Sequence, residues 1–162
     1  LDLEEGRIDK EEFRKGMCEI TGHEVSMQDA AYCWEGFFDG APVDRLRTLL
    51  ELKKDYHLGL LSNTNPFMME LTDSPRLSAD KRPISDYFHS MFLSYELKAY
   101  KPDEKIFRLA LERDGILADE TLFIDDAAKN IEGARRLGIH GLHVATNADW
   151  RPALTSLLRN GR

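Results

Sequence analysis

Three groups of polar residues follow apolar runs, and their side chains are of the types that bind phosphate and metal ions. Ser62 and Asn63 follow the first run, Lys101 comes after the second, and Asp125 and Asp126 follow the third. A hydroxyl and an amide donate hydrogen bonds to phosphoryl oxygens, and a lysine offsets phosphoryl charge. Two adjacent carboxylates repel each other, and a bound hard cation such as Mg²⁺ relieves this repulsion. Mg²⁺ typically binds one or two carboxylates together with a substrate phosphate.

Each group alone also has a simpler explanation. Ser62 and Asn63 are residue types that form turns and cap helices, here a helix starting at Pro66. A lone lysine is usually a solvated surface residue. One aspartate of the pair is able to cap the following helix while the other is solvated. The order of the three groups along the chain is therefore more informative than any one of them.

Strands and helices alternate from Pro42 onward, and they are the elements that must position these residues. Apolar runs predict strands at 58–61, 91–93, 121–124 and 141–144, and helical spacing predicts helices near 43–56, 103–111, 131–137 and 149–158. Such alternation implies an α/β fold with a parallel sheet, in which ligands bind beyond the carboxyl ends of the strands. We therefore expect the three groups at that edge.

The residues before Pro42 are predicted to form a helical hairpin. Asp9 with Glu12, and Ser26 with Asp29, have the spacing of capping boxes. The domain prediction is a helical cap over residues 1–41 and an α/β core over residues 42–162. The helical spacing of three aromatic residues in the cap predicts that they pack in its interior rather than face a ligand. These residues are Trp34, Phe37 and Phe38.

The net charge of −7 comes from interspersed acidic and basic residues. Nucleic-acid binding needs clustered Lys and Arg, so we expect no nucleic-acid partner. No apolar run is long enough to span a bilayer and no signal peptide is recognisable, so we expect no membrane partner and a cytoplasmic location. The sequence leaves both a monomer and a homodimer open.

Together the three groups resemble the motifs of the haloacid dehalogenase (HAD) superfamily of hydrolases. The second motif is similar to Leu60-Leu61-Ser62-Asn63, the third to Tyr100-Lys101-Pro102-Asp103 with Ile106-Phe107, and the fourth to Phe123-Ile124-Asp125-Asp126 with Asn130 and Ala134. The resemblance covers nearly the whole chain and implies a Rossmann-like parallel sheet with a small helical cap. One small departure is Lys98, which stands where many members have glycine.

The resemblance also implies roles for the matching residues. Ser62 and Asn63 would hold the phosphoryl oxygens of the substrate. Lys101 would neutralise and orient the phosphate and the nucleophile, which makes Ser62 and Lys101 the catalytic residues that match in this chain.

For the metal, the resemblance implies that Asp126 ligates Mg²⁺ directly, that Asp125 helps through water, and that Asn130 supports the pair. The first motif of the family, an Asp-x-Asp at the end of the central strand, is not matched. Residues 1–4, Leu-Asp-Leu-Glu, have no apolar strand before them. We therefore expect the nucleophile and the central strand in an upstream segment, and we expect this chain alone to be inactive.

The leading functional prediction is a Mg²⁺-dependent phosphatase that acts on a small phosphorylated metabolite through an aspartyl phosphate. One alternative is a metal-independent 2-haloacid dehalogenase, which has little use for the carboxylate pair Asp125–Asp126. Another is a catalytically silent binding or regulatory module of the same fold. The three matching motifs favour the enzyme over the silent module.

Overall fold

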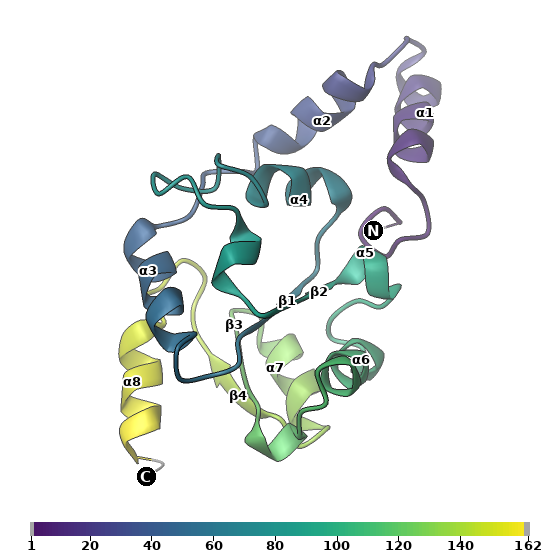
Figure 1. The fold of residues 1–162 in the computed structure, drawn as a ribbon. Coiled ribbons are helices and arrows are strands. Elements are labelled where there is room, and N and C mark those ends of the chain that lie inside the picture. Colours follow the sequence, from purple (N-terminus) through teal and green to yellow (C-terminus); the bar gives the residue numbers. More distant parts are fainter. Residues whose placement is uncertain (1, 161–162) are drawn as a thin grey trace. The chain divides into compact units, whose positions relative to one another are not determined.

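A computed structural model describes residues 2–160 (Figure 1). The chain forms two compact units, one ending at Tyr100 and the other beginning at Lys101. The N-terminal unit contains α1 (Lys10–Thr21), α2 (Met27–Glu35), α3 (Val43–Leu52), β1 (Gly59–Ser62), α4 (Pro66–Thr72), η1 (Ile84–Tyr87), β2 (Ser90–Leu93) and α5 (Ser94–Leu97). The C-terminal unit contains α6 (Glu104–Asp114), η2 (Ala118–Glu120), β3 (Leu122–Asp125), α7 (Ala128–Arg135), β4 (His140–His143) and α8 (Arg151–Asn160). The predicted boundary between cap and core at residues 41 and 42 is a different division and stays a prediction.

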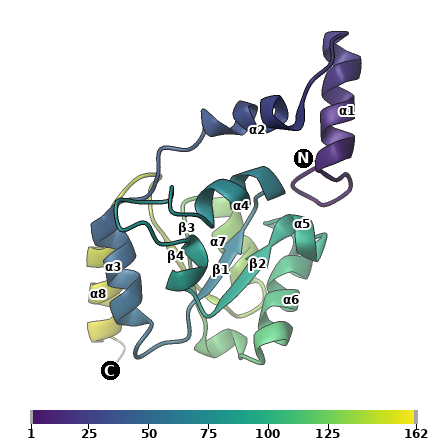
Figure 2. The same cartoon turned by 45° about the horizontal axis from the view of Figure 1, so that its top comes forward.

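The strands confirm the predicted α/β fold with parallel pairing. In the N-terminal unit β1 pairs with β2, and the last pair in register is Ser62 with Leu93 (Figure 2). In the C-terminal unit β3 pairs with β4, and the last pair is Asp125 with His143. Polar residues of the predicted site therefore end a strand in each unit, at the edge where parallel sheets bind ligands.

The predicted helical hairpin is α1 and α2, and both capping boxes are formed. Asp9 caps α1, Ser26 caps α2, and α1 ends at Gly22 in the left-handed conformation with a φ of 70°. Leu3 and Ala30 are buried with Phe67 of α4, and further apolar side chains of the hairpin pack around them. The hairpin is thus anchored on α4 by apolar burial.

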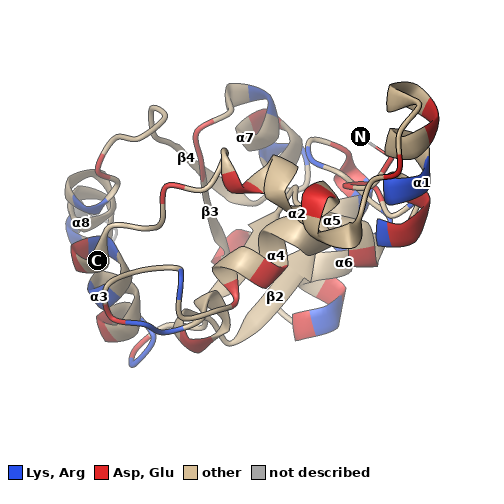
Figure 3. Ribbon diagram, turned by 90° about the horizontal axis from the view of Figure 1, so that it is seen from above, with Lys and Arg blue, Asp and Glu red and all other residues tan. Residues whose placement is uncertain are grey.

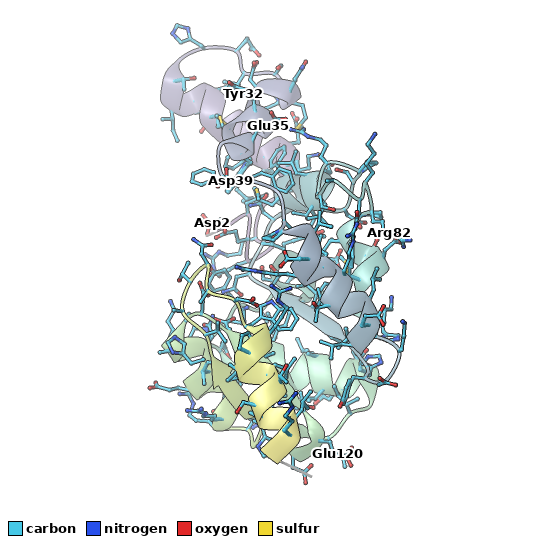
Figure 4. All side chains as sticks on the ribbon, turned by 90° about the vertical axis from the view of Figure 1, so that its left-hand side faces the viewer. Asp2, Tyr32, Glu35, Asp39, Arg82 and Glu120 are labelled. Carbon is cyan, nitrogen blue, oxygen red and sulfur yellow. The ribbon has the colours of Figure 1, made fainter. Side chains whose placement is uncertain are left out.

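The aromatic prediction for the hairpin is right for one residue and wrong for two. Trp34 packs against the buried cluster of the hairpin. Phe37 is 77% exposed, and Phe38 packs instead on the cluster that contains Leu46 and Tyr87. The reason is that α2 ends at Glu35, labelled in Figure 4, so helical spacing does not place the residues beyond it.

In the C-terminal unit, α7 lies against β3 and β4 and buries Ile131 and Ala134. Its Gly133 faces the segment before α6 at close range. A Cβ on Gly133 would lie 2.6 Å from the carbonyl oxygen of Pro102 and 3.2 Å from the ring of Phe107. Glycine is therefore required where α7 approaches the residue that follows Lys101.

Charged residues of both signs are interspersed along the helices and loops of each unit (Figure 3). The expectation that the chain has no nucleic-acid partner rests on this interspersed pattern and stays a prediction. Within residues 2–160, none of the helices has the length and apolar character needed to cross a membrane.

Gly133→Ala is expected to lower the free energy of unfolding by roughly 1–3 kcal/mol, because the added methyl group overpacks against Pro102. The matched control is Gly16→Ala in α1, where nothing lies within 4 Å of the position that the methyl group would occupy. That change is expected to raise stability by about 0.5–1 kcal/mol, since alanine is the better helix former. Urea denaturation followed by circular dichroism measures both, and a stabilised Gly133→Ala variant would contradict the packing argument.

Candidate functional site

Ser62 ends β1, and the three residues after it lead into α4. Asn65 caps that helix, because its Oδ1 accepts a hydrogen bond from Met68 N at 3.1 Å. The simpler explanation of Ser62 and Asn63 as the cap of this helix is therefore wrong. Asn63 hydrogen-bonds to the phenol of Tyr100, whereas the Ser62 hydroxyl makes no hydrogen bond within the described part of the chain. Because it has no such partner, the Ser62 hydroxyl is able to donate a hydrogen bond to a ligand.

Ser94 fixes the loop that follows Ser62, and sequence reasoning did not single it out. Its fully buried hydroxyl oxygen accepts a hydrogen bond from Thr64 N at 3.0 Å and lies 2.6 Å from the carbonyl oxygen of Glu4. Nearby, Gly6 has a φ of +65°, and a Cβ there would lie 2.0 Å from the carbonyl oxygen of Tyr95. One serine thus joins the end of β2 to two loops. Ser94 lies one residue beyond the Ser62–Leu93 pair, and this strand register, which the sequence does not provide, is what places it beside the loop after Ser62.

Lys101 and Asp125 form a buried ion pair in the C-terminal unit. The distance from Lys101 Nζ to Asp125 Oδ2 is 2.8 Å, and the two side chains are only 10% and 8% exposed. Asp125 Oδ1 also accepts hydrogen bonds from Ala127 N at 2.8 Å and from Asn130 Nδ2 at 2.9 Å. Burial raises the pKa of Asp125, but these hydrogen bonds outweigh it and hold the pKa below its ordinary value. The carboxylate is therefore ionised, and Lys101 is not a solvated surface lysine.

The Lys101 ammonium also lies 5.4 Å from the centroid of the Phe123 ring on β3. Lys98 stands where the resemblance implies glycine, and its backbone conformation fits that residue type. Lys98 ends α5 with a φ of 49° and a ψ of 45°, a left-handed conformation that glycine adopts without steric cost. Lysine at this position retains the same turn.

Asp126, next along the chain, is exposed and differs from Asp125 in its partners. Thr146 Oγ1 donates a hydrogen bond to Asp126 Oδ2 at 2.8 Å, and no hydrogen bond from residues 2–160 reaches Oδ1. Both aspartates line a hollow of about 280 Å³. The other lining residues are Ile124, Val144, Ala145, Asn147, Ala148 and Trp150. The simpler explanation, one aspartate as helix cap and the other solvated, is right only in that Asp126 is exposed, because the cap residue of α7 is Ala127 and no side chain caps that helix.

The donor set fits Mg²⁺, which typically takes one or two carboxylates and completes its shell with water and substrate phosphate. Asp126 offers an oxygen to such an ion, while both oxygens of Asp125 already accept hydrogen bonds. Among the residues that the structure describes, no group of three His, Cys, Asp or Glu side chains converges as a complete metal site. The two aspartates alone would supply only part of a magnesium shell.

A sequence profile of haloacid dehalogenase-like hydrolases matches residues 3–138. The chain belongs to this family of hydrolases, as its motifs predicted. The match covers the strand ends that carry Ser62, Lys101 and the carboxylate pair.

Particular relatives resemble the chain over nearly its whole length. It is 38% identical over 159 residues to D-ribitol-5-phosphate phosphatase of Bacteroides thetaiotaomicron, covering 98% of this chain and 77% of the relative. A HAD-like hydrolase structure from Porphyromonas gingivalis superposes with a TM-score of 0.92 at 37% identity, covering 98% of this chain and 77% of that one. A HAD family enzyme of B. thetaiotaomicron, solved with magnesium and inorganic phosphate, superposes with a TM-score of 0.87 at 35% identity. The superposition covers 94% of this chain and 77% of that enzyme.

Ser94→Ala is expected to destabilise the protein by roughly 1–3 kcal/mol, because it leaves the buried Thr64 N–H without its acceptor. Ser78→Ala is the matched control, since the buried Ser78 hydroxyl has no hydrogen-bond partner among residues 2–160 and its loss should be neutral or stabilising. Chemical denaturation of the two variants measures the difference. Equal effects would show that the Ser94 hydrogen bonds contribute little.

Lys101→Met is expected to cost roughly 2–4 kcal/mol, because it leaves the Asp125 carboxylate buried without its cation. Arg108→Met is the control in the same unit, since Arg108 pairs with Glu104 at 3.3 Å but is 60% exposed, and its loss should cost less than about 1 kcal/mol. A double-mutant cycle with Asp125→Asn, measured by urea unfolding, isolates the coupling between Lys101 and Asp125. A coupling no larger than that of the exposed pair would refute the buried-pair argument.

Proposed function

We propose that the full-length protein is a Mg²⁺-dependent phosphatase acting on a small phosphomonoester. The observation that carries the proposal is the buried Lys101–Asp125 ion pair with the exposed Asp126 carboxylate beside it. The relative that hydrolyses D-ribitol 5-phosphate supports a small phosphorylated polyol as the substrate class. The helical segment over residues 1–41 is proposed as the cap that restricts substrate size.

The proposed roles of the side chains follow from their partners. Ser62, whose hydroxyl has no competing hydrogen bond within the described residues, and Asn63 donate to phosphoryl oxygens. Lys101 neutralises phosphoryl charge, and its pairing with Asp125 fixes the position of its ammonium.

Asp126 is the better candidate for direct metal ligation, because one of its oxygens remains available. Asp125 acts mainly by holding Lys101, and Asn130 supports Asp125 through its side-chain amide. A bound Mg²⁺ would supply charge stabilisation for the phosphoryl group as it is transferred.

The nucleophile is proposed to be an aspartate of an upstream Asp-x-Asp segment. Its carboxylate attacks phosphorus and the ester P–O bond breaks, while the second aspartate of that segment acts as general acid and donates a proton to the leaving alcohol. Water then hydrolyses the aspartyl phosphate to phosphate and the free carboxylate. This assignment predicts that residues 1–162 alone do not turn over substrate.

A metal-independent dehalogenase is the second candidate, and the pair Asp125–Asp126 disfavours it, since displacement of halide from carbon needs no cation. A silent binding module is disfavoured because the buried ion pair is costly to desolvate and is retained beside three matching motifs. A cytoplasmic protein that works as a monomer or homodimer, without nucleic acid or membrane, completes the proposal.

The test compares the full-length protein with its Asp126→Asn variant on D-ribitol 5-phosphate and on 2-chloropropionate, with Mg²⁺ or with EDTA. Release of phosphate is expected only with Mg²⁺, and Asp126→Asn should lower kcat/KM at least about 100-fold because it removes a metal ligand. Asp119→Asn, at an exposed position of η2, is the control and should retain full activity. Phosphatase activity that survives EDTA, or halide release without metal, would overturn the proposal.

A further inference from the structure

The chain that leaves β4 makes three hydrogen bonds to the carboxylate pair, two of them to Asp126. Val144 N donates to the Asp125 carbonyl oxygen at 3.1 Å, and His143 Nε2 lies 2.9 Å from the Asp126 carbonyl oxygen. Thr146 Oγ1 donates to Asp126 Oδ2 at 2.8 Å. Because the last strand pair is Asp125 with His143, these contacts continue the β3–β4 register beyond the sheet. All of them lie within the C-terminal unit.

A tight turn aims Thr146 at Asp126. Ala148 N donates to the carbonyl oxygen of Ala145 at 2.9 Å, which closes a four-residue turn with Thr146 and Asn147 at its centre. Asn147 has a φ of 63°, a conformation that asparagine tolerates better than most side chains. The sequence Ala-Thr-Asn-Ala therefore encodes both the reversal of the chain and the placement of the threonine hydroxyl.

These contacts are poorly suited to stabilising the fold. Thr146, Asp126 and His143 are all exposed, and a hydrogen bond contributes only about 0.5–1.5 kcal/mol even in favourable settings. Their effect is on orientation instead. The backbone of Asp126 is held through its carbonyl and its side chain through Oδ2, whereas Oδ1 accepts no hydrogen bond from the described residues, and Asp126 lines the hollow.

We propose that His143 and Thr146 are positioning residues that hold Asp126 in the orientation of a metal ligand. The inference rests on the proposed function, because it assumes that Asp126 binds a divalent cation. Groups that orient a metal ligand strengthen binding by removing the ligand's rotational freedom before the ion arrives. The Thr146 hydroxyl restricts the rotation of the Asp126 carboxylate. The His143 ring, with its proton on Nε2, restricts the backbone of Asp126.

The experiment measures the dissociation constant for Mn²⁺ by electron paramagnetic resonance of the free ion, using the full-length protein. Thr146→Val removes the hydroxyl at nearly constant volume and is expected to weaken Mn²⁺ binding about tenfold. Thr146→Ser keeps a hydroxyl and should restore affinity to within about threefold of wild type. His143→Ala should weaken binding, and His143→Gln, which offers an amide N–H, should recover part of the loss.

Two control variants in the same unit separate orientation from stability. Thr121→Val deletes a hydroxyl that donates to the Leu117 carbonyl oxygen at 2.6 Å. His140→Ala deletes a ring whose Nε2 lies 2.9 Å from the Asp119 carbonyl oxygen, three residues before His143 on the same strand. Both should leave Mn²⁺ affinity unchanged, whatever their effect on the melting temperature.

The outcomes distinguish the two proposals. Wild-type affinity in Thr146→Val, or equal weakening in Thr146→Ser and Thr146→Val, overturns the positioning role while the phosphatase proposal stands. Equal weakening in Thr121→Val also overturns it, since a general loss of stability then explains the effect. A wild-type protein that binds no Mn²⁺ overturns the proposed function and, with it, this inference.

Discussion

The constraint on which the C-terminal unit depends is the removal of the Lys101 ammonium from water. A lysine side chain that is 10% exposed requires compensation, and Asp125 provides it at 2.8 Å. The carboxylate in turn needs donors for its second oxygen, which Ala127 N and Asn130 supply. The helix α7 must therefore begin where it does, and Gly133 lets it approach the segment after Lys101. The close approach of α7 and the hydrogen bonds to Asp125 both accompany the burial of the Lys101 ammonium.

Much of the fold was predictable because local patterns and tertiary structure agree. The capping boxes at Asp9 and Ser26, the apolar runs and the left-handed Gly22 each acted as their residue types predict. The aromatic residues after α2 were not predictable in this way, since the helix ends at Glu35 and spacing no longer determines which side is buried. The short helices α5, η1 and η2 span too few residues to show a period.

Some residues of the candidate site were predictable from the sequence and others were not. Ser62, Lys101 and the carboxylate pair were identifiable because they follow apolar runs in a specific order. Ser94, His143 and Thr146 were not, because their partners are backbone carbonyls and a neighbouring carboxylate that only the strand register brings near. Serine, histidine and threonine in such positions have no distinctive sequence pattern. The pairing of Ser62 with Leu93 and of Asp125 with His143 is the information that sequence alone lacked.

The division between the two units falls at one peptide bond, and this has a consequence for how the chain tolerates change in length. Tyr100 hydrogen-bonds to Asn63 within the N-terminal unit, and the next residue, Lys101, pairs with Asp125 within the C-terminal unit. Boundaries between compact units usually accept inserted residues, because few contacts constrain them. Here both residues that flank the boundary are anchored by their side chains, each within its own unit, so an inserted residue would disturb one of these two contacts. Length variation among proteins built this way should avoid this junction and collect in the loop between α4 and η1.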